Sequence, residues 1–403
     1  MESKKLNIAV FLGSEPNSGG GFQYEYKVLD ILKKNHKDQN IKLKFYSLNE
    51  NLKNDFSDLN LDIKIIKENI FQRLHRYSLS NFFLYKIFSK IKMRFSYLEK
   101  QFIANQIDLV YFLGPNLASH GLGNIPYIFT LWDLGHLDLS EFPELSHNGQ
   151  FSAREFINNG SLKKAHKVIV DLEWGKQNVI KKYNIDEKRI EVLKFLPNIK
   201  IDKTSTVVQI KEKYNLKNDF IFYPANFCAH KNHIYILKAI KILREEKNID
   251  IDAIFSAPSD KGNLKYILNK AKEFKINDLI HYIGFVPKEE VPSLYQQSLS
   301  LVMPTYLGPT NIPPLEAFAF ETPVCYSDMP FFREQVGESA FFMDLKDPNS
   351  LVKNIITIQK DKKIVDEKRE KGLQVLKNWS DKDFYNKLLT IFNEFKYIRE
   401  LWK

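Results

Sequence analysis

The residues from 303 to 328, MPTYLGPTNIPPLEAFAFETPVCYSD, combine a potential anion site with a carboxylate. The apolar run 299–303 predicts a buried strand, and turn-forming residues follow it. Pro313 and Pro314 favour the first turn of a helix, whose free N–H groups can bind an anion. Glu316, expected in that first turn, could accept hydrogen bonds from the vicinal hydroxyls of a ribose. A solvated glutamate favoured by the helix dipole is the alternative interpretation.

A glycine-rich loop near the N-terminus has the second pattern that could bind a phosphate. Gly20 and Gly21 lie between a predicted strand at 7–13 and a helical run at 22–32. In this layout glycine lets backbone amides approach an anion closely. The GxGxxG spacing is absent, so the loop is not a dinucleotide fingerprint. A mobile loop without a ligand is the other interpretation.

Two titratable residues follow the strand predicted at 126–131. They are Asp133 and His136, in the sequence TLWDLGH. Ligands of open α/β sheets sit at the carboxyl ends of strands, so both residues are candidates for a catalytic site. A capping aspartate and a packed histidine would explain the same residues without any chemistry.

Strand-like and helix-like segments alternate along the whole chain, which predicts parallel sheets with helices on both faces. In the first half, strands are expected at 7–13, 42–48, 61–66, 108–113, 126–131 and 167–171, and the segment 190–197 completes the half. In the second half they are expected at 220–224, 252–256, 279–285, 299–303 and from 324 to 326, and the segment 340–344 closes the half. A chain of 403 residues is too long for one ordinary core and suggests two domains.

Composition limits the class of protein and of partner. The formal charge of +10 suggests a polyanionic partner, such as nucleic acid, anionic lipid or a phosphorylated substrate. Cys228 and Cys325 form no C-x-x-C pair, which argues against a zinc or redox site and for a reducing compartment. No apolar run approaches the roughly 20 residues of a membrane span, and the N-terminus is interpreted as a first strand, not a signal peptide.

The region 71–100 is the most basic part of the sequence. Seven Lys and Arg side chains stand there against one acid, Glu99. Apolar residues at helical spacing predict one face, which comprises Leu84, Ile87, Phe88, Ile91, Phe95, Leu98 and Phe102. The region is interpreted either as an interfacial helix on anionic lipid or as a core helix with a solvated basic face.

The stretch that contains Glu316 resembles the donor-binding segment of retaining GT-B glycosyltransferases of family 4, glycosyltransferase group 1. The resemblance rests on the sequences PPLEA at 313–317, TPV at 322–324 and SD at 327–328. The second Glu of the family's E-x7-E motif falls on Glu316. The first falls on Gly308, so this chain is a variant that lacks it. Amides around Thr310, Asn311 and Ile312 are expected to take over part of that donor contact.

The resemblance extends to three other places in the sequence. Lys231, in NFCAHKN, matches the family lysine that contacts the donor diphosphate, whereas Asn226 replaces the family arginine. Phe285 lies where the family holds the nucleotide base. Trp132 stands in place of the family's active-site histidine, next to the retained Asp133. The glycine loop at Gly20 and Gly21 would face the donor phosphates.

The resemblance implies a GT-B fold with two doubly wound, parallel-sheet (Rossmann-like) domains facing a central cleft. The expected boundaries are 1–200 for the acceptor-binding domain, 201–378 for the donor-binding domain and 379–403 for a helix that crosses back. The implied reaction transfers a sugar from a nucleotide sugar, with retention and without a cofactor or metal ion. No Asp-x-Asp metal motif stands at a suitable strand end, and the sequence at 250–252 opens a strand and is expected to be structural.

The expected partners are a nucleotide sugar and a saccharide or lipid-linked acceptor of polysaccharide or lipopolysaccharide synthesis. Contact with an anionic membrane through 71–100 is a further expectation, with the protein in the cytoplasm or at the inner face of the cell membrane. Nucleic acid is not expected. Two alternatives stay open: a nucleotide-sugar epimerase of the same architecture, and a non-catalytic polyanion-binding protein.

Overall fold

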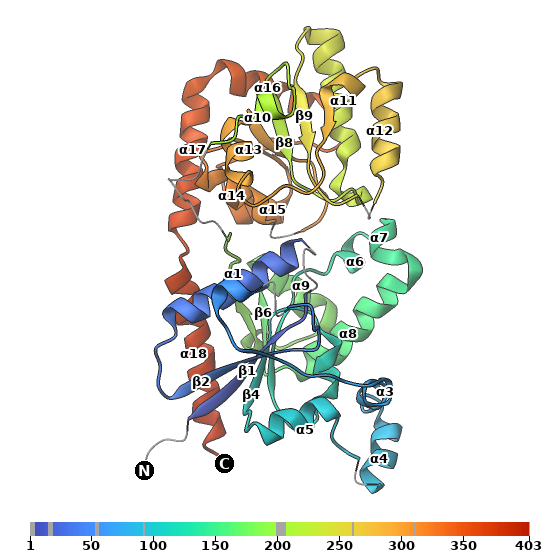
Figure 1. Ribbon diagram of the computed structural model, residues 1–403, viewed down its shortest axis with the longest axis vertical. Coiled ribbons are helices and arrows are strands. Elements are labelled where there is room, and N and C mark those ends of the chain that lie inside the picture. Colours follow the sequence, from blue (N-terminus) through green and yellow to red (C-terminus); the bar gives the residue numbers. More distant parts are fainter. Residues whose placement is uncertain are drawn as a thin grey trace. The chain divides into compact units, whose positions relative to one another are not determined.

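The computed structural model describes residues 5–14, 19–52, 56–91, 93–198, 207–259, 262–308 and 311–402 (Figure 1). The chain divides into two compact units. The first comprises Met1–Leu134, Asn148–Leu196 and Ser380–Lys403, and the second comprises Gly135–His147 and Pro197–Trp379. The segment Gly135–His147 thus belongs to the second unit, although the chain before and after it belongs to the first.

The first unit is built on a parallel sheet with the strand order β3-β2-β1-β4-β5-β6-β7. Its strands are β1 (Leu6–Leu12), β2 (Ile41–Ser47), β3 (Ile63–Ile65), β4 (Leu109–Phe112), β5 (Tyr127–Thr130), β6 (Lys167–Val170) and β7 (Ile190–Val192). Its longer helices are α1 (Gly20–Asn35), α3 (Ile70–Ser78), α4 (Phe82–Lys90), α5 (Tyr97–Ala104), α8 (Gln150–Lys164), α9 (Glu173–Tyr183) and α18 (Asp381–Arg399). Because the strand order reverses between β1 and β4, loops that follow these two strands flank the switch point of the sheet.

The second unit repeats this plan with the strand order β10-β9-β8-β11-β12-β13, also parallel. Its strands are β8 (Phe220–Tyr223), β9 (Asp252–Phe255), β10 (Ile280–Tyr282), β11 (Ser300–Met303), β12 (Val324–Ser327) and β13 (Phe341–Met343). Its helices include α6 (Gly135–Asp138), α7 (Pro143–Ser146), α10 (Ile210–Lys213), α11 (His233–Lys247), α12 (Leu264–Glu273), α13 (Val291–Gln297), α14 (Ile312–Ala319), α15 (Pro330–Val336), α16 (Asn349–Lys360) and α17 (Lys362–Lys377). The switch point of this sheet lies between β8 and β11.

The central strands of both sheets are buried along their whole length. Every residue of β4, β5, β8, β9, β11 and β12 is buried. Helices on both faces exclude water from such strands, which explains why they appear in the sequence as continuous apolar runs. The predicted class, two doubly wound parallel-sheet domains, is confirmed.

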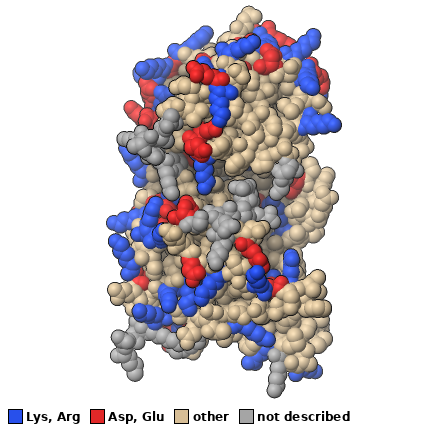
Figure 2. Space-filling view, viewed as in Figure 1, with Lys and Arg blue, Asp and Glu red and all other residues tan. Residues whose placement is uncertain are grey.

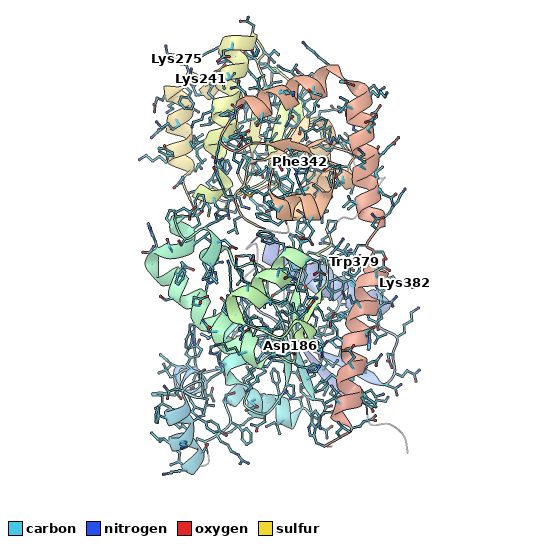
Figure 3. The ribbon with its side chains drawn as sticks, turned by 180° about the vertical axis from the view of Figure 1, so that it is seen from behind. Asp186, Lys241, Lys275, Phe342, Trp379 and Lys382 are labelled. Atoms are coloured by element: carbon cyan, nitrogen blue, oxygen red, sulfur yellow. The ribbon has the colours of Figure 1, made fainter. Side chains whose placement is uncertain are left out.

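Three ion pairs tie the last helix, α18, to the rest of the first unit, one of them between Lys167 of β6 and Glu394 at 3.3 Å. Lys27 of α1 lies 2.9 Å from Asp381 at the start of α18, and Arg399 near its end lies 3.0 Å from Asp108. Ser380 and Asp383 form a capping box at its N-terminus. Figure 3 labels Trp379 and Lys382, which flank the point where the chain passes from the second unit into α18. None of the described helices is long and apolar enough to cross a membrane.

The single apolar face predicted for 71–100 is wrong. The segment forms three helices, α3, α4 and α5, and not one continuous stripe. Asn69, Asn81 and Ser96 each accept a backbone N–H at the start of one of these helices, as N-caps do. As a result Leu98 of α5 is buried, whereas Ile87 of α4 is 56% exposed.

Candidate functional site

The loops after β8 and β11 meet at the switch point of the second unit. The backbone N–H of Tyr306 donates to the carbonyl of His230 at 2.9 Å, and the Thr305 hydroxyl donates to the same carbonyl at 3.4 Å. These bonds fix the loop that contains Lys231 against the loop that leads into α14. The sequence-predicted donor residues of this unit are therefore positioned by two neighbouring strands.

Lys231 and Asn311 are brought together by these loops. The Lys231 ammonium donates to the Asn311 Oδ1 at 3.2 Å. The Tyr223 hydroxyl, at the end of β8, donates to the Lys231 carbonyl at 2.8 Å and holds its backbone. The lysine side chain is half-buried. A partly desolvated cation at a strand end can balance the charge of a phosphate more strongly than a solvated one.

Asn311 is oriented by further hydrogen bonds. Its amide Nδ2 donates to the Gly308 carbonyl at 2.8 Å and to the Tyr326 hydroxyl at 2.9 Å. Gln335 Nε2 donates to its backbone carbonyl at 2.6 Å. Since both amide protons are used in this way, the acceptor oxygen of Asn311 is left facing Lys231. The sequence indicated Asn311 for its backbone amide, and nothing in it indicated this side-chain network.

Gly308, the position of the missing glutamate, has a backbone conformation that suits glycine. Its φ is +101°, and a Cβ built there would lie 2.6 Å from the Asn311 Oδ1. A side chain would therefore strain the backbone and displace the partner of Lys231. Thr310, the neighbouring donor-site candidate, lies outside the described residues.

Glu316 lies in the second turn of α14, not in the first as the sequence suggested. The helix begins at Ile312, one residue before the two prolines, so Glu316 is its fifth residue. The Tyr295 hydroxyl donates to the Glu316 Oε2 at 2.7 Å. Burial raises the pKa of Glu316, and the bond from Tyr295 opposes that rise. Ile312 is buried at the first helical position, where only its backbone can serve a ligand.

Phe285 follows β10 and is 61% exposed. The preceding Gly284 has a φ of +73°, and its carbonyl accepts a hydrogen bond from the Ser256 hydroxyl at 3.1 Å. An exposed aromatic side chain on an anchored turn can stack on a planar ring. Its predicted role at the nucleotide base stays a prediction.

The two residues that follow β1, before the predicted glycine loop, are bonded to a carboxylate of the protein itself. The Glu25 carboxylate, buried on α1, accepts from the backbone N–H groups of Gly13 and Ser14 at 3.0 and 3.1 Å. Burial raises its pKa to about 7, against the lowering effect of these bonds. Glu25 was not singled out in the sequence, because a glutamate in a helical run resembles a solvated residue.

Gly20 and Gly21 form the first turn of α1. Gly20 is exposed with open space around it, whereas a Cβ at Gly21 would lie 2.5 Å from the Trp132 ring. The same ring leaves no room for a side chain at Gly114, and Trp132 Nε1 donates to the Leu113 carbonyl at 3.2 Å. Trp132 thus packs into the switch point of the first sheet. Donor binding by Gly20 and Gly21 stays a prediction.

Asp133 and His136 fall in different compact units. Asp133, after β5 in the first unit, forms an ion pair with Arg154 of α8 at 3.2 Å. His136 lies on α6 in the second unit and is fully buried. The ion pair gives Asp133 a structural partner that the sequence did not reveal, and the catalytic role of both residues stays a prediction.

One set of side chains in the described part of the chain has a composition that could hold a metal ion. The ligand atoms of Glu144, Cys228 and His230 lie within 4.8 Å of one another. Glu144 already accepts from the backbone N–H of His230 at 2.8 Å and is bonded to its ring Nδ1. Its pKa is lowered to about 2, because these bonds outweigh the opposing effect of burial. Cys228 is only half-buried, whereas Cys325 is fully buried.

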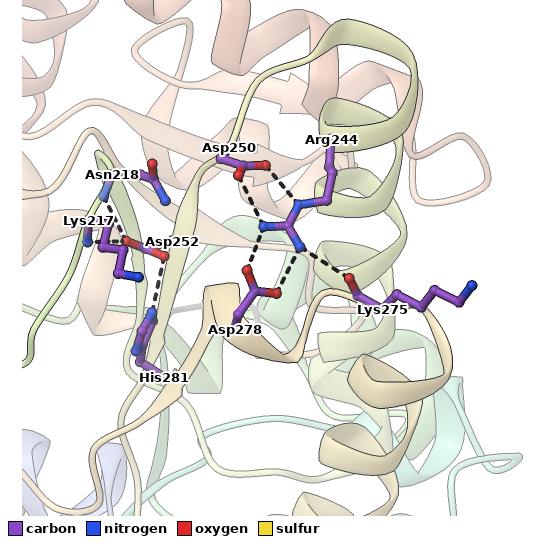
Figure 4. Close-up of polar contacts among 8 residues, drawn as sticks. All are labelled: Lys217, Asn218, Arg244, Asp250, Asp252, Lys275, Asp278 and His281. Carbon is purple, nitrogen blue, oxygen red and sulfur yellow. Dashed lines mark hydrogen bonds and ion pairs between the residues drawn. The ribbon is translucent and has the colours of Figure 1, made fainter.

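The carboxylates of the Asp-x-Asp sequence face different partners (Figure 4). Asp250 pairs with Arg244 at 2.8 Å, and Arg244 also binds Asp278 at 2.7 Å. Asp252 accepts from the backbone N–H groups of Lys217 and Asn218 at 3.1 and 3.0 Å and from His281 at 3.1 Å. Both carboxylates therefore join segments of the second unit.

The second unit also matches a known family. Residues 207–374 match the family model described as Glycosyl transferases group 1. Every donor-site candidate of the second unit lies within the matched residues, whereas the first unit lies outside them.

Two curated proteins to which this chain is similar are O-antigen chain mannosyltransferases. The protein RfbU of Salmonella typhimurium is 28% identical over 206 residues, which cover 50% of this chain and 54% of the relative. O-antigen chain mannosyltransferase B of Escherichia coli is 24% identical over 253 residues, which cover 60% of this chain and 65% of the relative. The chain thus spans about half to two thirds of the length of these relatives.

The fold is similar to that of HepE from Anabaena, solved with UDP-glucose. The TM-score is 0.72 at 13% identity, over 96% of this chain and 99% of HepE. At that identity the likeness concerns the GT-B fold alone.

Proposed function

We propose that this protein is a retaining glycosyltransferase that moves a hexose from a nucleoside diphosphate sugar to an acceptor hydroxyl. The observation that carries the proposal is the contact between Lys231 and Asn311 at 3.2 Å, formed by the loops after β8 and β11. It places one cation at the switch point of the group 1 unit, where open α/β sheets bind their ligands.

In the proposed reaction the bond from the anomeric carbon to the diphosphate oxygen breaks. A new bond forms from the anomeric carbon to the acceptor oxygen, and the acceptor proton passes to the departing diphosphate. Lys231 and the backbone amides at the start of α14 stabilise the charge that develops on this leaving group. Glu316, oriented by Tyr295, accepts hydrogen bonds from the ribose hydroxyls. No metal ion is required in this scheme.

The names of the two curated relatives support a mannose donor and an acceptor in O-antigen synthesis. The proposed acceptor is a saccharide chain on a lipid carrier, and the proposed place of work is the inner face of the cell membrane. The basic first unit fits such an acceptor, because its carrier presents phosphate groups.

The test is thermal unfolding with UDP, GDP, dTDP, CMP and NAD, with tripolyphosphate as the control for charge attraction. Binding to the native state alone raises the midpoint of unfolding. We expect one nucleoside diphosphate to raise it beyond tripolyphosphate, and we expect Lys231→Ala and Glu316→Gln to remove the difference. Equal shifts with every polyanion would contradict the donor site. Free sugar isomers formed without an acceptor would indicate an epimerase instead.

A further inference from the structure

Helix α4 and the residues after it contact α3. His75 of α3 bonds through Nε2 to the Met93 carbonyl at 2.8 Å, and its ring lies 4.6 Å from the ring of Phe88 in α4. Helix α3 is itself anchored by Arg76, which is 3% exposed and donates to the Leu117 carbonyl at 3.4 Å. The pair therefore forms a fixed projection of the first unit, seen beside α5 in Figure 1.

The projection exposes large apolar side chains. Phe83, Ile87 and Ile91 at α4 are 75%, 56% and 57% exposed, and Phe71 and Leu74 of α3 are 78% and 59% exposed. Figure 2 shows the resulting uncharged surface over α3 and α4, with Lys and Arg atoms at its edge. Soluble proteins rarely expose so many neighbouring apolar side chains unless the surface binds something.

The charge around these side chains has one sign. No Asp or Glu occurs between Asn69 and Leu98. Lys86 and Lys90, one turn apart on α4, are exposed, as are Arg73 and Arg94. Because successive helical residues turn by about 100°, Phe83 and Ile87 share one side of α4 and the two lysines form a stripe beside it. Apolar residues flanked by cations are the pattern of a helix that lies in a membrane interface.

We propose that α3 and α4 dock the protein on a bilayer of anionic phospholipid, with Phe83 and Ile87 among the acyl chains and Lys86 and Lys90 at the headgroups. A second copy of the chain fits the surface less well, because a symmetric contact would oppose cations to cations. The inference deepens the proposed function, because the bilayer is the surface that holds a lipid-linked acceptor. It rests on the proposed function for the identity of that acceptor.

The experiment is co-sedimentation of the full chain with vesicles of phosphatidylcholine, with and without phosphatidylglycerol. We expect binding to the anionic vesicles only, weakened by salt. Lys86→Glu with Lys90→Glu should weaken it at least tenfold, because each cation near an anionic surface contributes separately. Phe83→Ser with Ile87→Ser should weaken it by a similar factor at high salt, where the apolar contribution dominates.

Matched substitutions elsewhere should leave the binding unchanged. Lys275→Glu with Lys382→Glu changes the same charge at two exposed lysines on other parts of the chain (Figure 3). Tyr397→Ser removes an aromatic side chain that is 73% exposed on α18, close to the exposure of Phe83. Equal losses in the control variants, or binding to neutral vesicles as strong as to anionic ones, would overturn the proposal.

Two further readouts separate this inference from the proposed function. The α4 variants should keep the nucleotide-dependent thermal shift, whereas Lys231→Ala should keep vesicle binding and lose that shift. Size-exclusion chromatography tests the other occupant of the surface. A dimer in the absence of vesicles that becomes a monomer in Phe83→Ser would assign the surface to self-association and overturn membrane docking.

Discussion

The two units use the same topology at their switch points and fill them differently. In the first unit the Glu25 carboxylate takes the amides of Gly13 and Ser14 that end β1, and Trp132 packs against Gly21. In the second unit the loop that ends β8 carries the cation Lys231 next to the loop that ends β11. One switch point thus holds a buried carboxyl group of the protein itself, and the other presents a cation.

This difference shows that backbone amides at the end of such a strand can be bonded to a carboxylate of the same chain, so the pattern of strand, glycine loop and helix does not by itself identify a phosphate site. The sequence patterns at both strand ends predicted anion binding, because both supply free amides and glycine. The two strand ends differ in the side chain that lies next to the loop, and that side chain comes from another part of the sequence. Lys231 contacts a residue 80 positions away, and Glu25 on α1 contacts Gly13, 12 positions before it.

The largest expected effect comes from the second switch point. Lys231→Ala should lower the rate of sugar transfer by about 10² to 10³-fold, the usual effect of removing one group that stabilises developing charge. Steady-state rates with the nucleotide sugar identified by thermal shift provide the measurement. Lys238→Ala, at an exposed lysine of α11, is the control. Equal rates for both variants would remove the contrast between the two units.

The second prediction concerns the carboxylate in the first switch point. Since the pKa of Glu25 is raised from 4.5 to about 7, the native state binds more protons than the unfolded state between these values. The contribution of protonated Glu25 to the stability of the first unit should therefore be complete below pH 4.5. It should be lost as the pH rises through 7, which lowers the free energy of unfolding by about 3 kcal/mol in total.

Glu25→Gln should remove this fall, because the amide oxygen can still accept from Gly13 and Ser14 and carries no charge. Denaturant unfolding at several pH values from 4 to 8 provides the measurement. Glu246→Gln, at an exposed position of α11, should leave the slope unchanged. A slope that persists in Glu25→Gln would show that the buried carboxylate is not its source.

The third prediction concerns the glycine that replaces the family glutamate. Gly308→Ala should weaken nucleotide binding about tenfold, because the strain of a positive φ costs roughly 1–3 kcal/mol and the new Cβ presses on Asn311. Gly308→Glu should not restore a missing contact and should weaken binding further. Gly337→Ala, also at a positive φ but with open space around it, is the matched control. Tighter binding in Gly308→Glu would contradict this account.

The strands of both sheets were predictable because fully buried strands appear as short apolar runs. Each predicted strand overlaps an observed one, and the errors are of one or two residues at most ends, with a larger one at β10. The candidate site was predictable where a motif fixes it, as at Lys231, Asn311 and Glu316. Contacts between distant residues, such as Tyr295 with Glu316 and Glu144 with His230, left no pattern in the sequence.

The region 71–100 shows why an apolar period alone is insufficient. The spacing of Leu84, Ile87 and Ile91 is that of a helix face whether the face is buried or exposed. Only the packing of the helix determines that these residues face water. The breaks between the helices did have a signal. Asn81 and Ser96 are good N-cap residues, and treating them as helix starts would have divided the region correctly.

The smallest effect is expected in a test of whether a metal ion, and not Lys231, supplies the positive charge in the second unit. Asp250 is 44% exposed and paired with Arg244, so Asp250→Asn should cost at most about 1 kcal/mol of stability. Sugar transfer should change less than about twofold in this variant and after treatment with a chelator, because the proposed reaction uses no metal. A tenfold loss that excess Mn²⁺ restores would assign the charge to a metal ion, and the contrast between the two switch points would then no longer rest on Lys231.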